Sequence, residues 1–242
     1  MRCAFFSLIC FFILLSACEL SVTSEASDSE SSKAVLEESS EKSPEEKSIH
    51  DADSDQADLS PFDRDRRGDE HLFAGRFDDA IADYDAFLKE RPEFDAQHWR
   101  RGIAYYYAER YKEGAAQFER HRVVNPDDVE NAAWHFLCQA RALGVDKARA
   151  AILPVGPDQR DPMKAVYRLY AGRAKPADVL EEAQASTQRD ALFFAHLYLA
   201  LYFDVLGETD RAETHIGKAT GEYGRSHYMG QVAQVHARVL AD

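Results

Sequence analysis

The sequence of 242 residues is poor in cysteine and in positive charge. Cys3, Cys10 and Cys18 lie near the start, so Cys138 is alone in the remainder and no intramolecular disulfide can form there. Lysine and arginine number 29 against 43 acidic residues, with no basic stripe, which argues against nucleic-acid binding. Glycine-rich phosphate loops, His-Glu-x-x-His and paired Cys-x-x-Cys motifs are also missing. We therefore expect no enzyme activity, no cofactor and no metal site.

The N-terminal segment has the layout of a secretory signal. Arg2 supplies one positive charge, residues 4–15 form an apolar run, and small residues follow. The run is shorter than the about 20 residues that a transmembrane helix needs. Residues 15–18 (LSAC) resemble the bacterial lipobox, which implies a signal peptide over 1–17 and a lipid on Cys18. The alternative is an ordinary signal peptide with an incidental cysteine.

Residues 18–59 form a predicted tether that begins at the lipidated cysteine. Positions 19–59 hold 13 acidic residues, 3 lysines and 11 serines, a net charge of −10 out of −14 for the whole chain. Such a segment buries too little apolar surface to offset its chain entropy, so we expect it to be disordered. Its root-mean-square span is about 35–40 Å. The simplest interpretation is a solvated spacer without a specific partner.

The remainder, 60–242, contains an internal repeat. When 61–94 is aligned with 95–128, four residue types coincide at a spacing of 34. The coinciding pairs are Gly68 with Gly102, Phe77 with Tyr111, Tyr84 with Phe118, and Pro92 with Pro126. The period and these residue types resemble the tetratricopeptide repeat (TPR), in which small residues let two antiparallel helices approach. Gly114 departs from the pattern by replacing the usual alanine.

Further helices follow with a weaker repeat. We predict helices over 131–143, 162–171, 176–185, 191–206, 210–219 and 226–240, and a short helix that Asp146 caps. The last helix carries Tyr228, Val232, Val235 and Val239 on one face and should cap the final pair. The fold class predicted for 60–242 is all-α: a TPR-like helical solenoid of about five helix pairs plus a C-terminal capping helix.

A closer resemblance is to the NlpI-type periplasmic TPR lipoproteins. The stretch 101–107 (RGIAYYY) carries it most specifically, followed by 170–172 (YAG), 196–199 (HLYL) and 206–207 (LG). The resemblance implies a scaffold that binds envelope proteins, including a tail-specific protease and peptidoglycan hydrolases. This chain departs from the family in its longer acidic tether and in having fewer N-terminal helices. The predicted lipidation indicates a location in the bacterial cell envelope, and Glu19, directly after the lipidated cysteine, favours the outer membrane facing the periplasm.

The predicted binding surface is the concave face, which the first helix of each TPR pair usually lines. In the second unit the inward positions carry aromatic and arginine side chains, the types that dominate binding hot spots. The candidate partner-binding residues are Trp99, Arg100, Ile103, Tyr106, Tyr107 and Trp134. The alternative is that these aromatics pack between helices. His196 and His215 could approach one another across their pair, most simply as packing residues.

Three functions remain open on the sequence. The favoured one is a membrane-tethered scaffold that binds another envelope protein in its groove. The second is a structural assembly factor for an outer-membrane complex, and the third an accessory subunit of a cell-wall enzyme. The sequence leaves open whether the protein is a monomer or a homodimer, and it does not name the partner.

Overall fold

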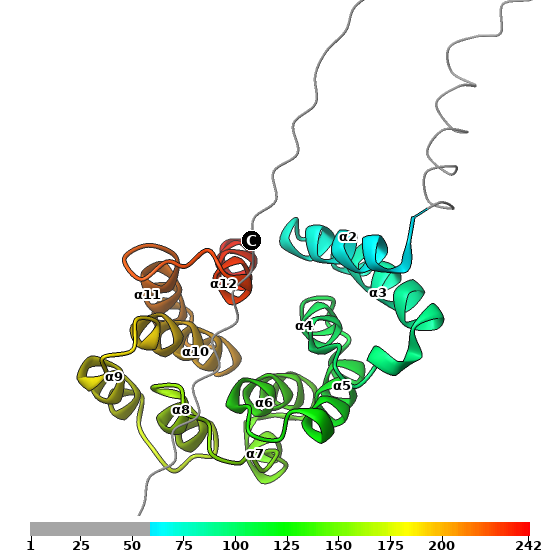
Figure 1. The fold of residues 1–242 in the computed structure, drawn as a ribbon. Coiled ribbons are helices and arrows are strands. Elements are labelled where there is room, and N and C mark those ends of the chain that lie inside the picture. Colours follow the sequence, from blue (N-terminus) through cyan, green and yellow to red (C-terminus); the bar gives the residue numbers. More distant parts are fainter. Residues whose placement is uncertain (1–58) are drawn as a thin grey trace, which may run out of the picture. The chain divides into compact units, whose positions relative to one another are not determined.

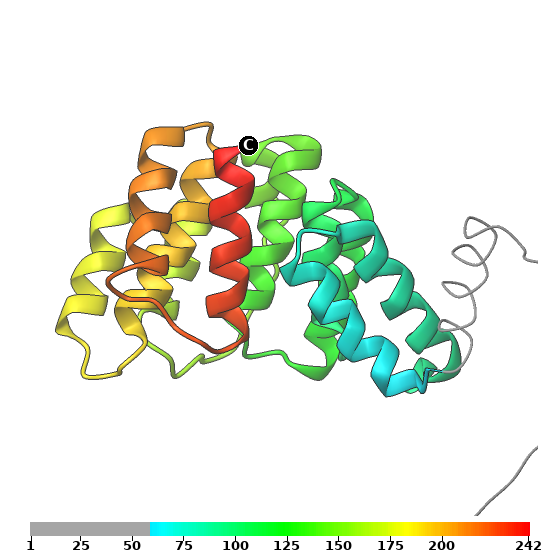
Figure 2. The ribbon, with the colours of Figure 1, turned by 90° about the horizontal axis from the view of Figure 1, so that it is seen from above.

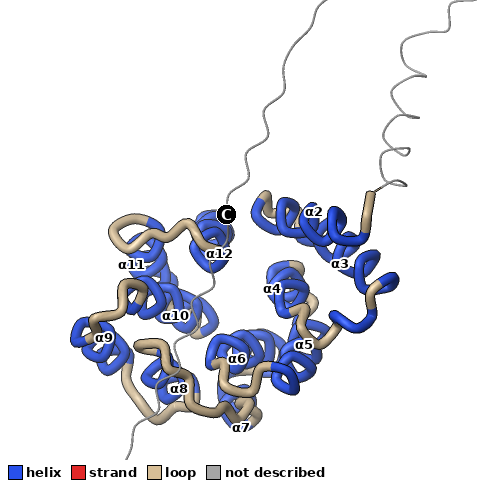
Figure 3. Tube along the Cα trace, in the orientation of Figure 1, coloured by secondary structure: helices blue, strands red, loops and turns tan. Residues whose placement is uncertain are grey.

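The computed structural model describes residues 59–242, which belong to one compact unit. The predicted signal peptide, Cys18 and nearly all of the tether lie outside these residues. Within the described range the chain is all-helical, with no strand (Figure 3). The helices are α2 (Pro61–Phe73), α3 (Phe77–Glu90), the 3-10 turn η1 (Pro92–Phe94), α4 (Trp99–Tyr107), α5 (Tyr111–Val124), α6 (Val129–Leu143), α7 (Val145–Ala150), α8 (Met163–Tyr170), α9 (Pro176–Ala185), α10 (Ala191–Val205), α11 (Thr209–Thr220) and α12 (Tyr228–Ala241).

Successive helices pack as neighbours along the chain. α2 packs on α3, α4 on α5, α6 on α7, α8 on α9 and α10 on α11, and α12 follows as a single helix (Figure 1). The all-α prediction is confirmed, and each predicted helix is present within a few residues of its expected ends.

The 34-residue repeat corresponds to a repeated packing contact. A Cβ atom added to Gly68 would lie 2.4 Å from the ring of Tyr84, and one added to Gly102 would lie 2.7 Å from the ring of Phe118. Both distances are too short for any side chain. Glycine at these positions therefore lets the first helix of a pair lie directly against an aromatic ring of the second.

The repeated prolines mark the ends of the second helices. α3 ends at Glu90 and α5 at Val124, in each case two residues before the proline. The residue before each proline, Arg91 or Asn125, has left the helical conformation. This follows from the clash between a proline ring and a helical residue before it.

The last helix closes the series of pairs onto the first. α12 packs on α11, as expected of a cap, and also on α2 (Figures 1 and 2). The rings of Tyr228 and Phe73 lie 4.9 Å apart, and the Tyr228 hydroxyl donates to Asp69 at 3.2 Å. Arg238 donates to the carbonyl of Phe73 at 2.5 Å. The helices of the unit therefore form a closed ring, which repeat spacing alone did not predict.

One local prediction, the cap of α7, was wrong. Gly144, not Asp146, is the N-cap of α7, because the chain turns there with a φ of 92° that favours glycine. Val239 is 42% exposed, although it continues the apolar face of α12. A surface hollow between the last turn of α12 and the turn at 74–75 leaves its side chain uncovered.

Candidate functional site

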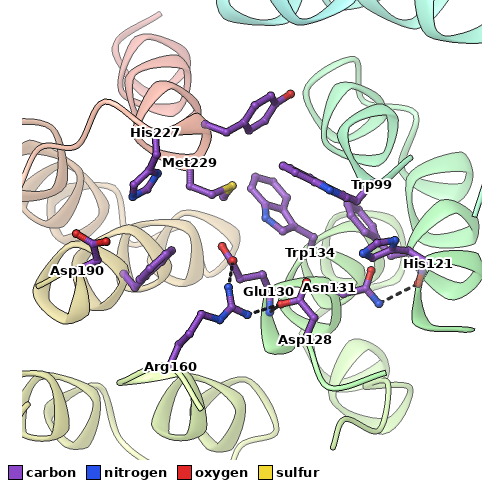
Figure 4. Close-up of a pocket in the computed structure, with 13 residues that line it drawn as sticks. Trp99, His121, Asp128, Glu130, Asn131, Trp134, Arg160, Asp190, His227 and Met229 are labelled. Atoms are coloured by element: carbon purple, nitrogen blue, oxygen red, sulfur yellow. Dashed lines mark hydrogen bonds and ion pairs between the residues drawn. The ribbon is translucent and has the colours of Figure 1, made fainter. Parts of the chain in front are cut away.

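A cavity of about 440 Å³ opens at one end of the ring. The starts of α4, α6, α10 and α12 meet there, so its lining comes from segments far apart in sequence. Its volume is at the lower end of ligand pockets, about 300–1,000 Å³. It is large enough for a short segment and too small for a folded domain. The lining residues are Trp99, Phe118, His121, Asp128, Glu130, Asn131, Trp134, Arg160, Asp190, Phe194, His227, Tyr228 and Met229 (Figure 4).

Aromatic rings form the walls of this cavity. Trp99 meets Tyr228 edge-on, with 4.9 Å between ring centroids, and Trp134 stacks near Phe118 at 6.4 Å. These two tryptophans are the only ones in the chain. Large rigid rings contribute much contact area at a low entropic cost, as in protein-binding surfaces.

One corner of the cavity is charged. Arg160, from the loop before α8, donates to Asp128 at 2.5 Å and to Asp158 at 2.6 Å, and it also pairs with Glu130 (Figure 4). Glu130 further accepts a hydrogen bond from the Tyr198 hydroxyl at 2.6 Å. The network ties the loop to the start of α6 and to α10, so the corner is rigid.

The lining carries more negative than positive groups. Asp128, Glu130 and Asp190 face the cavity with Arg160 as the one arginine or lysine among the lining residues. Burial raises the pKa of Glu130; the Arg160 guanidinium opposes that shift and the Asp128 carboxylate adds to it. The α6 N-terminus, where Asp128 is the N-cap and Glu130 lies in the first turn, favours the charged form of these two carboxylates.

Two polar atoms in the lining are buried without a partner. Within residues 59–242, the indole N–H of Trp134 and the side-chain oxygen of Asn131 make no hydrogen bond. The Asn131 amide is held in place because its nitrogen donates to the Phe118 carbonyl at 3.0 Å. An unmade hydrogen bond costs about 1–3 kcal/mol for each buried group. One unpartnered donor and one unpartnered acceptor therefore lie on adjacent turns of α6, in residues that line the cavity.

Two of the six predicted binding residues line this cavity, and a third, Arg100, points away from it. Trp99 and Trp134 line it. Arg100 instead turns toward α2, where it pairs with Asp65 and Asp69, each at 2.5 Å. Its charge is used to hold α4 against α2.

The other three candidates are buried and do not line this cavity. Ile103, Tyr106 and Tyr107 are 0%, 5% and 9% exposed. Tyr106 packs on Trp134 at 5.4 Å, and Tyr107 lies 6.1 Å from His236 of α12. The expectation of an open concave face at these positions does not fit their burial, because rings from α3, α6 and α12 pack against the two tyrosines. We call Tyr106, Tyr107 and His236 the sealed cluster.

Several lining residues were missed by the sequence argument. Asp128 and Asp190 carried a signal as helix starts, but nothing local distinguished them from ordinary caps. Glu130, Asn131 and Met229 sit in first turns that only the closed ring brings together. Arg160 lies in an irregular loop whose position depends on contacts with α6.

Two histidines lie close together outside this cavity. His196 and His215 do approach, with 2.8 Å between their Nδ1 atoms. His196 is 4% exposed and stacks on Tyr223, which fits a packing role. In the described part of the chain, no group of three or more His, Cys, Asp or Glu side chains is placed to hold a metal ion.

The described helices were also compared with the requirements of a membrane span. None of those between residues 59 and 242 is both long enough and apolar enough to cross a bilayer. A comparison of the sequence with known protein families gave no match to any family model.

Proposed function

We propose that this protein is a lipid-anchored adaptor of the bacterial cell envelope, which binds a segment of another envelope protein in the cavity. The observation that carries the proposal is the cavity lining: aromatic walls, a free donor and a free acceptor, all on rigid helices. This is the composition of a binding site, with anchors for shape and a few polar groups for orientation.

The helical architecture supports the proposal at a coarser level. Packed helix pairs present surfaces for protein partners, and the paired contacts of Gly68 and Gly102 favour TPR-like repeats. Two further contacts repeat at the same spacing of 34. Arg67 bonds Asp83 at 2.7 Å, and Arg101 bonds Gln117 at 3.1 Å.

The anchor supports it from the sequence side. The lipobox-like residues 15–18 and the acidic tether predict a domain held some tens of Å from a membrane. In cells supplied with labelled palmitate, the wild-type protein should incorporate the label and Cys18→Ala should not, with no change in the thermal unfolding of the helical unit. Equal incorporation by both proteins would contradict lipidation of Cys18.

The binding step is tested by co-purification. The full-length protein is purified from detergent-solubilised envelopes beside Trp99→Ala and the matched control Val123→Ala, a residue 77% exposed on α5. We expect a partner that co-purifies with wild type and with Val123→Ala and is lost with Trp99→Ala. A partner retained equally by all three proteins would place binding outside the cavity and overturn the proposal.

A further inference from the structure

The charges of the cavity indicate what kind of segment it binds. Three carboxylates, from Asp128, Glu130 and Asp190, line it against the single guanidinium of Arg160. Arg160 already pairs with Asp128 and Glu130, and Asp190 pairs with Arg225. A ligand carrying a negative charge would add to this excess, whereas a positive charge would offset it.

The walls favour a positive group as well. Aromatic faces attract cations, and Trp99, Phe194 and Tyr228 line the same cavity as the carboxylates. The cavity already contains one example, since the guanidinium of Arg160 lies 5.9 Å from the centre of the Phe194 ring. Acidic and aromatic groups therefore line the same cavity.

The unpartnered atoms indicate what carries the positive group. The N–H of Trp134 needs an acceptor and the oxygen of Asn131 needs a donor. Trp134 is 2% and Asn131 3% exposed, and the Trp134 indole extends from α6 toward Trp99 and Met229 in the lining (Figure 4). A single peptide group supplies both a carbonyl acceptor and an N–H donor.

We propose that the cavity binds an extended peptide segment bearing a lysine or arginine side chain. The charged group lies among the carboxylates of Glu130, Asp128 and Asp190, and a peptide group of the same segment bonds Asn131 and Trp134. This inference rests on the proposed function and specifies its ligand. The acidic tether of the chain itself has the wrong charge for this site, so the segment belongs to a partner.

The experiment uses the intrinsic fluorescence of the full-length protein. Both tryptophans of the chain line the cavity, so the signal reports on it directly. The probes are blocked tripeptides, acetyl-Ala-Lys-Ala-amide and acetyl-Ala-norleucine-Ala-amide, which differ only in the ammonium group. Isothermal titration serves as a second readout. We expect the lysine peptide to bind about tenfold more tightly, a factor that corresponds to about 1.4 kcal/mol.

Variants test the source of the preference. Glu130→Gln should reduce the tenfold preference to about twofold, and Asp190→Asn provides a second variant outside the Arg160 network. Glu119→Gln is the matched control, because this carboxylate on α5 pairs with His135 and does not line the cavity. It should leave the preference unchanged.

The outcomes separate this inference from the proposed function. Equal affinity for the two peptides, or a preference that survives both Glu130→Gln and Asp190→Asn, would overturn the basic-segment proposal. The proposal would also be overturned if neither peptide changed the tryptophan fluorescence or gave a heat of binding. If the partner still fails to co-purify with Trp99→Ala, the adaptor proposal stands even though the basic-segment proposal has failed. Butylamine binding as tightly as the lysine peptide would contradict the role of the peptide group.

Discussion

Aromatic residues occur at both ends of the inner helices, but they line a cavity at one end and are buried at the other. At the N-terminal ends of α4, α6 and α12, Trp99, Trp134 and Tyr228 surround a cavity with charged groups. Farther along α4 and α12, Tyr106, Tyr107 and His236 form the sealed cluster. Aromatic richness on an inner helix therefore does not identify a binding face; an adjoining cavity does.

Buried polar atoms without a hydrogen-bond partner occur at both ends, but only those at the cavity could gain one from a ligand. In the described residues, the hydroxyls of Tyr106 and Tyr107 and both ring nitrogens of His236 lack hydrogen bonds. Tyr107 borders a surface hollow beside Gly75 and Phe77, but its hydroxyl and the other three atoms are buried, so their cost falls on stability. At the cavity, the same kind of cost can be recovered when a ligand binds. The predictions below test whether stability and binding separate in this way.

The largest effect is expected from the sealed cluster. Tyr107→Ala removes a buried ring that stacks on Phe77 at 5.3 Å and leaves a void. We expect the free energy of unfolding to fall by about 3–5 kcal/mol. Urea denaturation followed by circular dichroism measures it. A loss below about 1 kcal/mol would show that this end is not packed as described.

The second effect is a dependence of stability on pH. Burial lowers the pKa of His236 to about 4, below its ordinary value of 6.5. As pH falls below 6.5 the unfolded chain takes up the proton first, so stability is complete above pH 6.5 and declines toward pH 4. The loss from this group reaches about 3 kcal/mol. His236→Leu should flatten the urea midpoint between pH 7 and pH 5, and an unchanged slope would contradict this origin. His196, whose pKa burial and His215 also lower to about 4, adds a slope that remains in that variant.

A smaller loss of stability is expected from Gly102, which lies in the middle of α4. Gly102→Ala places a methyl group 2.7 Å from the Phe118 ring and should cost about 1–3 kcal/mol. Gly217→Ala on α11 is the matched control, since a Cβ there meets nothing within 4 Å. Its expected effect is a gain of about 0.5–1 kcal/mol, the helix propensity of alanine over glycine. The difference in melting temperature between the two variants checks the close approach, and equal shifts would argue against it.

The smallest effect on stability is expected from the cavity wall. Trp99→Ala removes a half-buried ring and should lower the free energy of unfolding by about 1–2 kcal/mol. The same variant should lose the partner in co-purification. The comparison would fail if this substitution destabilised the protein as much as Tyr107→Ala, because binding could then not be separated from folding.

The elements of the fold were predictable because they depend on local patterns. Apolar spacing, glycines after helices and prolines beyond them mark the ends of α6, α9 and α10 within two residues. Closure of the ring was not predictable, because it is the sum of small angles between successive pairs. The contact of Tyr228 with Phe73 spans 155 positions of chain, and no local pattern reports it.

The site residues were also predictable only where the evidence for them is local in the sequence. Trp99 and Trp134 were predicted as binding residues and line the cavity, since large aromatics at the starts of inner helices are visible in the sequence. Tyr106 and Tyr107 are also aromatic residues on an inner helix, but the rings of Trp134 and His236 pack against them. Glu130 and Arg160 meet across 30 positions of chain, a pairing that depends on how the loop before α8 folds back.

The most direct test places a photo-crosslinking amino acid at each end of α12 in the full-length protein in living cells. Position 227 is exposed at the cavity, and position 239 is exposed at the opposite end of the same helix. The adaptor account predicts that the probe at His227 crosslinks to an envelope protein, that Trp99→Ala abolishes the product, and that the probe at Val239 gives none. Crosslinking from position 239 to the same partner, with none from position 227, would contradict it.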